Sequence, residues 1–254
     1  MAHSSPTLTT VDKADIERHS KVSDWWNKKG SLRGLHSFNK LRIPYIVNNL
    51  ILTDEKRNSS KPLKNKKILD VGCGGGIVSE ALAKLGAEVT AVDASSVLIE
   101  MAKKHTASNA ELDDNKPTYH CTSIEEHAQT FVNYYDAVVA SEIVDHVANV
   151  ELFLDSCVQT LKPGGKIFIT TPNRTRISQF CVIFMAENVL NLVPKGLHQY
   201  YKFRTPDEVG AILQKYNCQV NEVYGLFFNP LTENWLWSYF QHMWYALVAT
   251  KLSI

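Results

Sequence analysis

Cysteine is sparse in this sequence, and the cysteines never occur in closely spaced pairs. Five cysteines are scattered singly along 254 residues, so their number is odd and no C-x-x-C motif is present. A disulfide-stapled secreted domain needs a dense, even set of cysteines, and a zinc knuckle needs paired ones. The sequence therefore argues against both classes and favours a reducing compartment.

A surplus of charge of one sign is missing as well. The chain carries 27 lysines and arginines against 26 aspartates and glutamates, which gives a formal net charge of +1. Without a strong positive field there is little to attract a phosphate backbone, so nucleic-acid binding is not favoured.

The start of the sequence shows no targeting pattern. The first ten residues, MAHSSPTLTT, contain neither the apolar core of a secretory signal peptide nor the arginines of a mitochondrial transit peptide. Either the protein needs neither signal, or a presequence has been left out of this sequence.

What the chain does contain is the composition of an ordinary globular protein, with 44% hydrophobic and 21% charged residues. Residues 11–26 predict a helix that ends at a Trp-Trp pair, and the polar, basic stretch 53–67 is typical of a linker. We expect a single structural domain overall. It comprises an N-terminal helical cap and linker over 1–64, followed by a main domain over 65–254 with a hydrophobic insertion at 175–200.

Short apolar runs alternate with helical stretches between residues 68 and 171. KILDV precedes IVSEALAKL, AEVTAV precedes SVLIEMAKKH, and YDAVVA precedes VELFLDSCVQTL, which leads into KIFITT. This alternation predicts an α/β fold with a mostly parallel sheet and helices on both faces. Ligands of such folds bind where the C-terminal ends of the strands meet. After residue 230, an aromatic-rich loop precedes a last strand that we expect to be antiparallel.

A glycine-rich loop follows the first of these strands in ILDVGCGGGIVSEAL, and it predicts a nucleotide-type ligand close to the backbone. A dinucleotide fingerprint that starts at Gly72 and Gly74 requires a small third residue, but Ile77 occupies that position, so NAD is disfavoured. Asp70 suits the positive amino or sulfonium group of S-adenosylmethionine better than a pyrophosphate. Asp93 ends the next strand, where a carboxylate binds ribose hydroxyls; its alternative role is a helix N-cap.

With these motifs the sequence resembles the class I S-adenosylmethionine-dependent methyltransferases. The segments ILDVGCGGG, VTAVD, YDAVVASE and LKPGGKIFITT match their ordered motifs over residues 65–172. The resemblance implies S-adenosylmethionine as the cofactor. It also implies a Rossmann-like fold whose mostly parallel, seven-stranded sheet ends in an antiparallel strand.

Outside this common core, the sequence resembles the ubiquinone biosynthesis O-methyltransferases. The resemblance runs from about residue 12 to 251 and rests on WWNKKGSLRGLHSFNKLRIPYI, ASEIVDHV, VPKGLHQYYKF and GLFFNPLT. It implies O-methylation of catechol-type hydroxyls on polyprenyl dihydroxybenzoate and demethylubiquinol intermediates. Two alternatives stay open, namely an O-methyltransferase for another hydrophobic small molecule and a non-catalytic cofactor-binding scaffold of a biosynthetic complex.

The same resemblance extends the set of cofactor contacts. Arg42 and Ser141 match cofactor-contacting positions of the family, and the two residues after the third strand are candidates for the adenine edge. The expected cofactor-binding residues are Arg42, Asp70, Gly72, Gly74, Asp93, Ser123, Ile124 and Ser141.

The segment ASEIVDHVA gathers three polar residues directly after an apolar run. If that turn is helical, the i, i+3, i+4 spacing places Glu142, Asp145 and His146 on one face, where they could share a metal ion. The alternative is an ordinary helix start with acidic residues that the helix dipole favours. The resemblance implies the family's metal-binding E-x-x-E-H motif, from which Asp145 departs by one methylene.

A metal ion would assist the implied chemistry. A catechol hydroxyl is a poor nucleophile at neutral pH, and a divalent cation lowers its pKa and orients its oxygen. Mg²⁺ is the first expectation for the carboxylates, although an imidazole would equally accept Mn²⁺, Co²⁺ or Zn²⁺. We expect Glu142 and His146 to be the catalytic residues, with His146 as the alternative general base.

The apolar segment ISQFCVIFMAENVLNLV, residues 177–193, is too short to span a bilayer and has no clean polar face. Burial in the core is one interpretation. The polyprenyl substrates of the resembled family reside in membranes, so we expect a peripheral membrane contact here. The resemblance further implies a multiprotein ubiquinone-synthesis complex on the matrix side of the mitochondrial inner membrane, or at the cytoplasmic side of a bacterial inner membrane.

Overall fold

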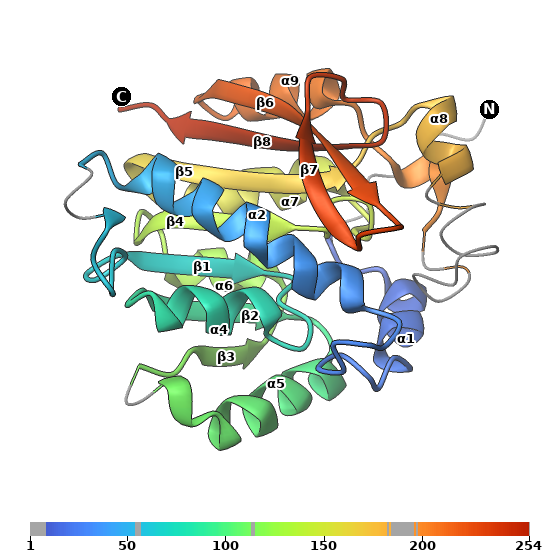
Figure 1. Ribbon diagram of the computed structural model, residues 1–254. Coiled ribbons are helices and arrows are strands. Elements are labelled where there is room, and N and C mark those ends of the chain that lie inside the picture. Colours follow the sequence, from blue (N-terminus) through green and yellow to red (C-terminus); the bar gives the residue numbers. More distant parts are fainter. Residues whose placement is uncertain are drawn as a thin grey trace.

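The computed structural model describes residues 9–53, 57–112, 115–181, 183, 196 and 198–253. Its centre is a sheet of eight strands in the order β3-β2-β1-β4-β5-β8-β6-β7 (Figure 1). The first five strands in this order pair in parallel, and the last three join antiparallel. The strands are β1 Lys67–Val71, β2 Glu88–Asp93, β3 Thr118–Cys121, β4 Tyr135–Ser141, β5 Leu161–Pro172, β6 Cys218–Asn229, β7 Asn234–Ser238 and β8 Trp244–Lys251.

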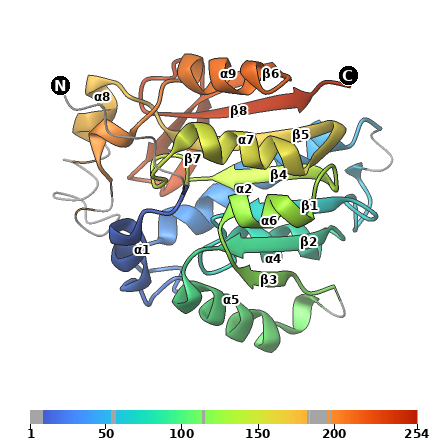
Figure 2. The ribbon, with the colours of Figure 1, turned by 180° about the vertical axis from the view of Figure 1, so that it is seen from behind.

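Helices cover both faces of the sheet, as Figures 1 and 2 show from opposite sides. One face carries α2 and α4, and the other carries α6, α7 and α9. Helix α5 packs on β2 and β3. The helices are α1 Lys13–Ser20, α2 Arg33–Leu50, α4 Ile77–Lys84, α5 Ser96–Ser108, α6 Ile124–Thr130, α7 Val150–Thr160, α8 Arg176–Ser178 and α9 Pro206–Lys215, with short 3₁₀ turns η1 Ala110–Leu112 and η3 Tyr200–Lys202.

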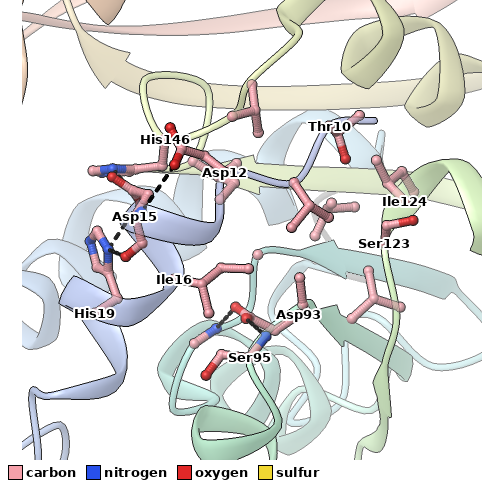
Figure 3. Close-up of a pocket in the computed structure, with 18 of the residues that line it drawn as sticks. Thr10, Asp12, Asp15, Ile16, His19, Asp93, Ser95, Ser123, Ile124 and His146 are labelled. Carbon is pink, nitrogen blue, oxygen red and sulfur yellow. Dashed lines mark hydrogen bonds and ion pairs between the residues drawn. The ribbon is translucent and has the colours of Figure 1, made fainter. Parts of the chain in front are cut away.

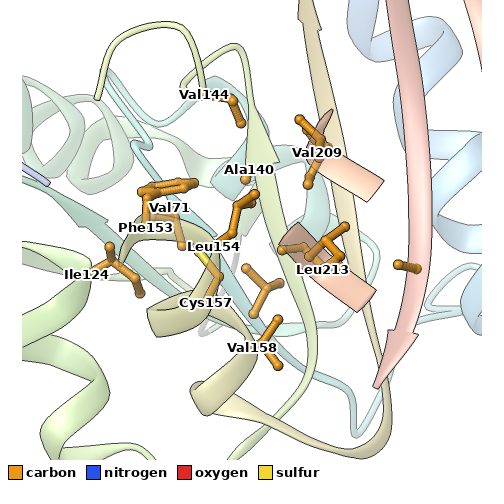
Figure 4. Close-up of a cluster of buried hydrophobic side chains, with 14 of the residues drawn as sticks. Val71, Ile124, Ala140, Val144, Phe153, Leu154, Cys157, Val158, Val209 and Leu213 are labelled. Carbon is orange, nitrogen blue, oxygen red and sulfur yellow. The ribbon is translucent and has the colours of Figure 1, made fainter. Parts of the chain in front are cut away.

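The middle of β4 is apolar because both faces of this central strand are buried. In β4, Ala137 and Val139 belong to the core under α2 and α4, whereas Val138 and Ala140 belong to the core under α7 and α9. Figure 4 shows this second core, in which α7 residues such as Phe153 and Leu154 lie against the sheet. Alternate residues of one strand thus serve two cores, which is the pattern of a parallel sheet between helical layers.

The structure confirms the predicted α/β fold with its antiparallel last strand, β8, and it has one strand more than the seven expected. The additional strand is β7, which pairs with β6 as a hairpin inside the segment expected to be an aromatic-rich loop. Residues 162–165 lie within the bounds of β5, but the pairing with β4 jumps from Leu161 to Lys166, so these four residues have no partner in the β4 register.

The N-terminal helix is shorter than predicted. Helix α1 ends at Ser20, so Trp25 and Trp26 lie in the loop that follows it rather than at its end. The long helix α2, which contains Pro44, lies within the segment 1–64 for which a helical cap and linker were expected. Among the described residues, no helix has the length and apolar character needed to cross a membrane.

Candidate active site

A cleft of about 750 Å³ opens at the C-terminal ends of β1, β2 and β4. Five predicted cofactor residues line it, and helix α1 covers it with Asp15, Ile16 and His19 (Figure 3). The predicted residues in the lining are Gly72, Gly74, Asp93, Ser123 and Ile124. The parallel strands therefore end where the sequence places the ligand.

The glycine loop is shaped by backbone that an L side chain would strain. Gly72 has a φ of 69°, and a Cβ there would lie 2.5 Å from Cγ1 of Ile143. Gly74 has a φ of 52°, and its N–H donates to Oδ2 of Asp93 at 3.0 Å. The loop thus needs glycine both for its backbone conformation and for close approach by neighbouring groups.

Asp93 holds the two cofactor loops together. Its other oxygen accepts from the N–H of Ser95 at 2.8 Å. Burial raises the pKa of Asp93, while the hydrogen bonds from Ser95 and Gly74 oppose that rise. The alternative role of Asp93 as a helix N-cap is wrong, because the cap of α5 is Ser95.

Three predicted cofactor residues lie behind the cleft rather than in its lining. Arg42 is 4% exposed and donates to Oγ of Ser141 at 2.8 Å. Asp70 is 2% exposed and accepts from Oγ of Ser79 at 2.5 Å. Burial raises the pKa of Asp70 to about 6, despite the opposing hydrogen bond from Ser79 and charge of Arg42. Burial also lowers the pKa of Arg42 to about 10.

The turn over Glu142, Asp145 and His146 is not helical, so the condition for placing them on one helix face is not met. Glu142 has a φ of 57°, in the left-handed region, and its N–H donates to the carbonyl of Thr170 at 2.8 Å. A tight turn follows, in which the N–H of His146 donates to the carbonyl of Ile143 at 2.9 Å. The segment leaves β4 as an irregular turn, so helical spacing does not describe the side-chain directions.

The Glu142 carboxyl is buried and only partly satisfied. Its Oε2 accepts from Nε1 of Trp244 at 3.2 Å, and Oε1 has no hydrogen-bond partner among the described residues. Burial, assisted by the nearby charge of Asp145, raises the pKa of Glu142 to about 7. A carboxyl that titrates near neutrality within a cleft is a candidate proton acceptor.

Asp145 and His146 lie together beside the same cleft. Asp145 is 2% exposed, and its Oδ1 accepts from Oγ1 of Thr171 at 3.2 Å. Its Oδ2 lies 3.4 Å from Nε2 of His146 and has no hydrogen-bond partner among the described residues. On the other side of the imidazole, Nδ1 of His146 lies 3.1 Å from Oδ2 of Asp15 (Figure 3).

His146 belongs to two clusters of potential metal ligands whose atoms all lie within 4.8 Å of one another. One cluster joins it to Asp145 and His198, and the other joins it to Asp15 and His19. Glu142 is in neither of these clusters among the described residues, so the structure brings together two of the three predicted metal residues.

Sequence reasoning missed the contributions of α1 and of His198. Asp15 and His19 stand one helical turn apart, as ordinary surface residues of an amphipathic helix would. His198 lies in VPKGLHQYYKF, a segment that carried the family resemblance without a role for any single residue. Only the chain's folding brings these residues to His146.

Asp15 is surrounded by basic side chains from its own helix and from η3. Arg18 contacts Oδ1 of Asp15 at 2.6 Å, His19 contacts Oδ2 at 3.1 Å, and Lys202 lies 3.9 Å away. Burial acts to raise the pKa of Asp15, but contacts with His146, His19 and Arg18 outweigh it and hold that pKa well below its usual range. Asp15 is therefore an ionised carboxylate on the helix that covers the cleft.

Comparison with known proteins adds three findings. The family described as "Methyltransferase domain" matches residues 47–223. The chain is 40% identical over 248 residues to a mouse protein named "Ubiquinone biosynthesis O-methyltransferase, mitochondrial", which covers 97% of this chain and 67% of that protein. It is 37% identical over 250 residues to a "Ubiquinone biosynthesis O-methyltransferase" of Sinorhizobium fredii, covering 98% of this chain and 99% of that protein.

Solved structures agree on the fold. Magnesium protoporphyrin IX methyltransferase from Synechocystis PCC 6803, with bound SAH, superposes with a TM-score of 0.63 at 16% identity. The superposition covers 94% of this chain and 93% of the other. At that identity the likeness supports the fold alone.

Proposed function

The chain belongs to the ubiquinone biosynthesis O-methyltransferases, and on that premise we propose that it methylates catechol-type hydroxyls of polyprenyl dihydroxybenzoate and demethylubiquinol. The chain is an S-adenosylmethionine-dependent methyltransferase. The observation that carries the substrate proposal is the position of the Glu142–His146 turn, which adjoins the cofactor cleft and places carboxyl and imidazole groups at its edge. These groups suit activation of a phenolic oxygen.

The cofactor would lie between the glycine loop and α1. Gly72 and Gly74 line this part of the cleft, and Asp93 would accept the ribose hydroxyls. Ser123 and Ile124 line the end of the cleft nearest β3, where the adenine would rest. Arg42 and Asp70 would act from behind, because their buried charges lie next to the loop rather than in the cleft.

A divalent cation is part of this proposal, and the chain's donor set fits one in part. Oδ2 of Asp145, which has no hydrogen-bond partner among the described residues, lies 3.4 Å from Nε2 of His146. His198 is the third member of this cluster. A bound divalent ion would lower the pKa of the acceptor hydroxyl. Two imidazoles with one carboxylate favour Mn²⁺, Co²⁺ or Zn²⁺ over the Mg²⁺ first expected from the sequence.

Glu142 would then serve as the base rather than as a ligand. In the reaction the hydroxyl gives its proton to the base, its oxygen bonds the methyl carbon, and the C–S bond breaks to leave S-adenosylhomocysteine. Positioning provides most of the acceleration in such an in-line displacement. Glu142 has a suitable pKa of about 7 and an unpartnered oxygen. His146 is the alternative base.

The test is a methyl-transfer assay with methyl-labelled S-adenosylmethionine and two acceptors. Both acceptors carry the same dihydroxybenzoate ring, but only one has a prenyl tail. We expect transfer to the tailed acceptor, loss of transfer with chelator, and recovery with Mn²⁺. Equal transfer to both acceptors would indicate an enzyme for other hydrophobic phenols. Cofactor binding without turnover in the presence of Mn²⁺, Co²⁺, Zn²⁺ or Mg²⁺ would support the scaffold instead.

A peripheral membrane contact through residues 177–193 is a second part of the proposal. Ile177 and Phe180, at the start of this segment, are 47% and 56% exposed. Most of the segment, including its predicted apolar residues Val182, Phe184 and Met185, lies outside the described residues. An apolar segment that binds the membrane surface would bring the enzyme to a polyprenyl tail embedded in the bilayer.

Liposome flotation tests this contact. We expect the Ile177→Ser, Phe180→Glu variant to float less than the wild type, while a Leu231→Glu control floats like the wild type. Leu231 is 94% exposed on the turn between β6 and β7, outside the insertion. Equal flotation of all three proteins would remove the membrane contact.

A cellular location follows from these proposals. Relatives from mouse are named mitochondrial, whereas the Sinorhizobium fredii relative carries no such word. We therefore propose the matrix side of the mitochondrial inner membrane for a eukaryotic source, the cytoplasmic side of the inner membrane for a bacterial one, and membership in a ubiquinone-synthesis complex. Co-purification from crosslinked membranes would test that membership.

A further inference from the structure

We propose that Asp15 of helix α1 is a positioning residue for His146, so that the helix covering the cofactor also orients the methyl-acceptor site. The inference rests on the role given to His146 under the proposed function. Its basis is the contact at 3.1 Å between Oδ2 of Asp15 and Nδ1 of His146 (Figure 3). Nε2 of the same ring lies 3.4 Å from Oδ2 of Asp145.

A neutral imidazole has one N–H and one lone pair, and its surroundings decide which nitrogen carries the proton. A carboxylate at Nδ1 favours the proton there and leaves the lone pair on Nε2. The Nδ1 atom is buried and makes no aligned hydrogen bond with the described residues, so the Asp15 carboxylate is the polar group that meets it. The Nε2 lone pair would then be available to a cation shared with the Asp145 carboxylate, which lies 3.4 Å away.

The carboxylate that faces His146 is itself held in place. The Asp15 side chain is 6% exposed and the His146 side chain 9% exposed, so water does not screen their contact strongly. The Oδ1 atom of Asp15 is engaged by Arg18 at 2.6 Å, and Oδ2 faces both His19 and His146, each at 3.1 Å. A side chain fixed on one oxygen and presenting the other suits the support of a neighbouring ring.

The same residues could instead be read as a metal site of their own. Asp15, His19 and His146 cluster within 4.8 Å, but Arg18 and Lys202 lie beside the carboxylate and would repel a cation. The ring of His19 also lies with Nδ1 3.0 Å from the carbonyl of Asp15, in its own helix. The charges and the ring direction favour support of His146 over ion binding.

Helix α1 also meets the cofactor loops, which connects the two functions. Ser20 at its end hydrogen-bonds Ser95 at 2.7 Å, and Ser95 caps the helix that follows Asp93. Trp25, just beyond α1, packs so closely on the glycine loop that a Cβ on Gly74 would lie 2.2 Å from its ring. A cofactor that holds α1 closed would thus hold Asp15 against His146, and binding at the two sites would be coupled in both directions.

The test compares Asp15→Asn with Glu17→Gln in the full chain. Both variants remove one carboxylate charge from α1, but Glu17 is exposed, pairs with Lys21 and does not contact His146. We expect Asp15→Asn to weaken Mn²⁺ binding about 10–100-fold and to lower kcat with little change in the KM for S-adenosylmethionine. In the wild type and Glu17→Gln, S-adenosylhomocysteine should tighten Mn²⁺ binding about fivefold or more, and Asp15→Asn should abolish that coupling.

Further variants decide between outcomes. Asp15→Glu keeps the carboxylate and should have a higher kcat than Asp15→Asn. A kcat of Asp15→Glu no higher than that of Asp15→Asn would count against a positioning role. Wild-type-like Mn²⁺ affinity and kcat in Asp15→Asn would overturn the inference. A His19→Gln loss as large as that of Asp15→Asn would overturn it in favour of the metal cluster. Full turnover by His146→Gln would instead remove the proposed role of His146.

Discussion

The two ends of the cleft are assembled in different ways. The cofactor end is made by the short loops after β1 and β2. The Asp93 carboxylate joins these loops by accepting a hydrogen bond from the N–H of Gly74. The acceptor end gathers Asp15, His146 and His198 from three distant parts of the chain. A site made from neighbouring loops is robust and local, whereas a site made from distant segments depends on how those segments pack. Substitutions should therefore separate the two ends.

The strongest expected disturbance of the cofactor end is that of Gly72→Ala. The added Cβ would lie 2.5 Å from Cγ1 of Ile143, at a φ of 69° that L residues rarely adopt. We expect the loss of measurable S-adenosylhomocysteine binding by calorimetry. Gly164→Ala is the matched control, because its φ is 78° but a Cβ there has nothing within 4 Å. Equal effects of the two changes would show that backbone strain, not close approach, is decisive.

The buried carboxyl behind the cofactor loop should show itself in pH dependence. The folded pKa of Asp70 is about 6 against an ordinary 3.8, so the folded state holds the proton more tightly. Its contribution to stability is then full below about pH 4 and is lost as the pH rises to about 6, by roughly 3 kcal/mol. Denaturant unfolding of the cofactor-free protein measures this, and Asp70→Asn should remove that part of the slope. An unchanged slope in the variant would contradict the assignment.

Trp244→Phe should disturb the acceptor end with a smaller effect. It removes the Nε1 donor to Oε2 of Glu142 and leaves that buried carboxyl without a hydrogen bond from the described residues. We expect kcat to fall about tenfold, because a hydrogen bond to a charged group contributes about 1.5–3 kcal/mol. The affinity for S-adenosylhomocysteine should stay the same. A fall in affinity without a fall in kcat would show that Trp244 acts at the cofactor end and not at the acceptor end.

The smallest expected effect joins the two ends. Ser20→Ala removes the hydrogen bond between α1 and Ser95 and should cost about 1 kcal/mol in cofactor binding, a change of roughly fivefold. Isothermal calorimetry with S-adenosylhomocysteine measures it, and Ser108→Ala, in α5 but hydrogen-bonded only to the carbonyl of His105 among the described residues, is the control. No difference between the variants would show that α1 does not respond to the cofactor.

The same contrast explains how much could be predicted from the sequence. The alternation of strands and helices predicted the sheet, because the apolar run 137–140 of β4 must be buried on both faces. The glycine loop and Asp93 were predicted to lie at the cleft, because short motifs at strand ends determine their own neighbourhood. Local spacing was enough wherever the contacts were local.

Local spacing failed where contacts are distant. Glu142, Asp145 and His146 were predicted to share a helix face, but the left-handed backbone at Glu142 and the turn after it direct the side chains differently. The hydrogen bond from Trp244, in the last strand, engages Glu142, and Asp15 meets His146 from the first helix. No pattern within nine residues could encode partners from both ends of the chain.

The most direct test measures turnover and cofactor affinity of Glu142→Gln side by side. If Glu142 is the base at the acceptor end, kcat on a prenylated dihydroxybenzoate should fall at least about 100-fold. The dissociation constant of S-adenosylhomocysteine should stay within about threefold of the wild-type value, because Glu142 acts at the other end of the cleft. Undiminished turnover, or a joint loss of turnover and cofactor binding, would contradict the division of the cleft into two ends.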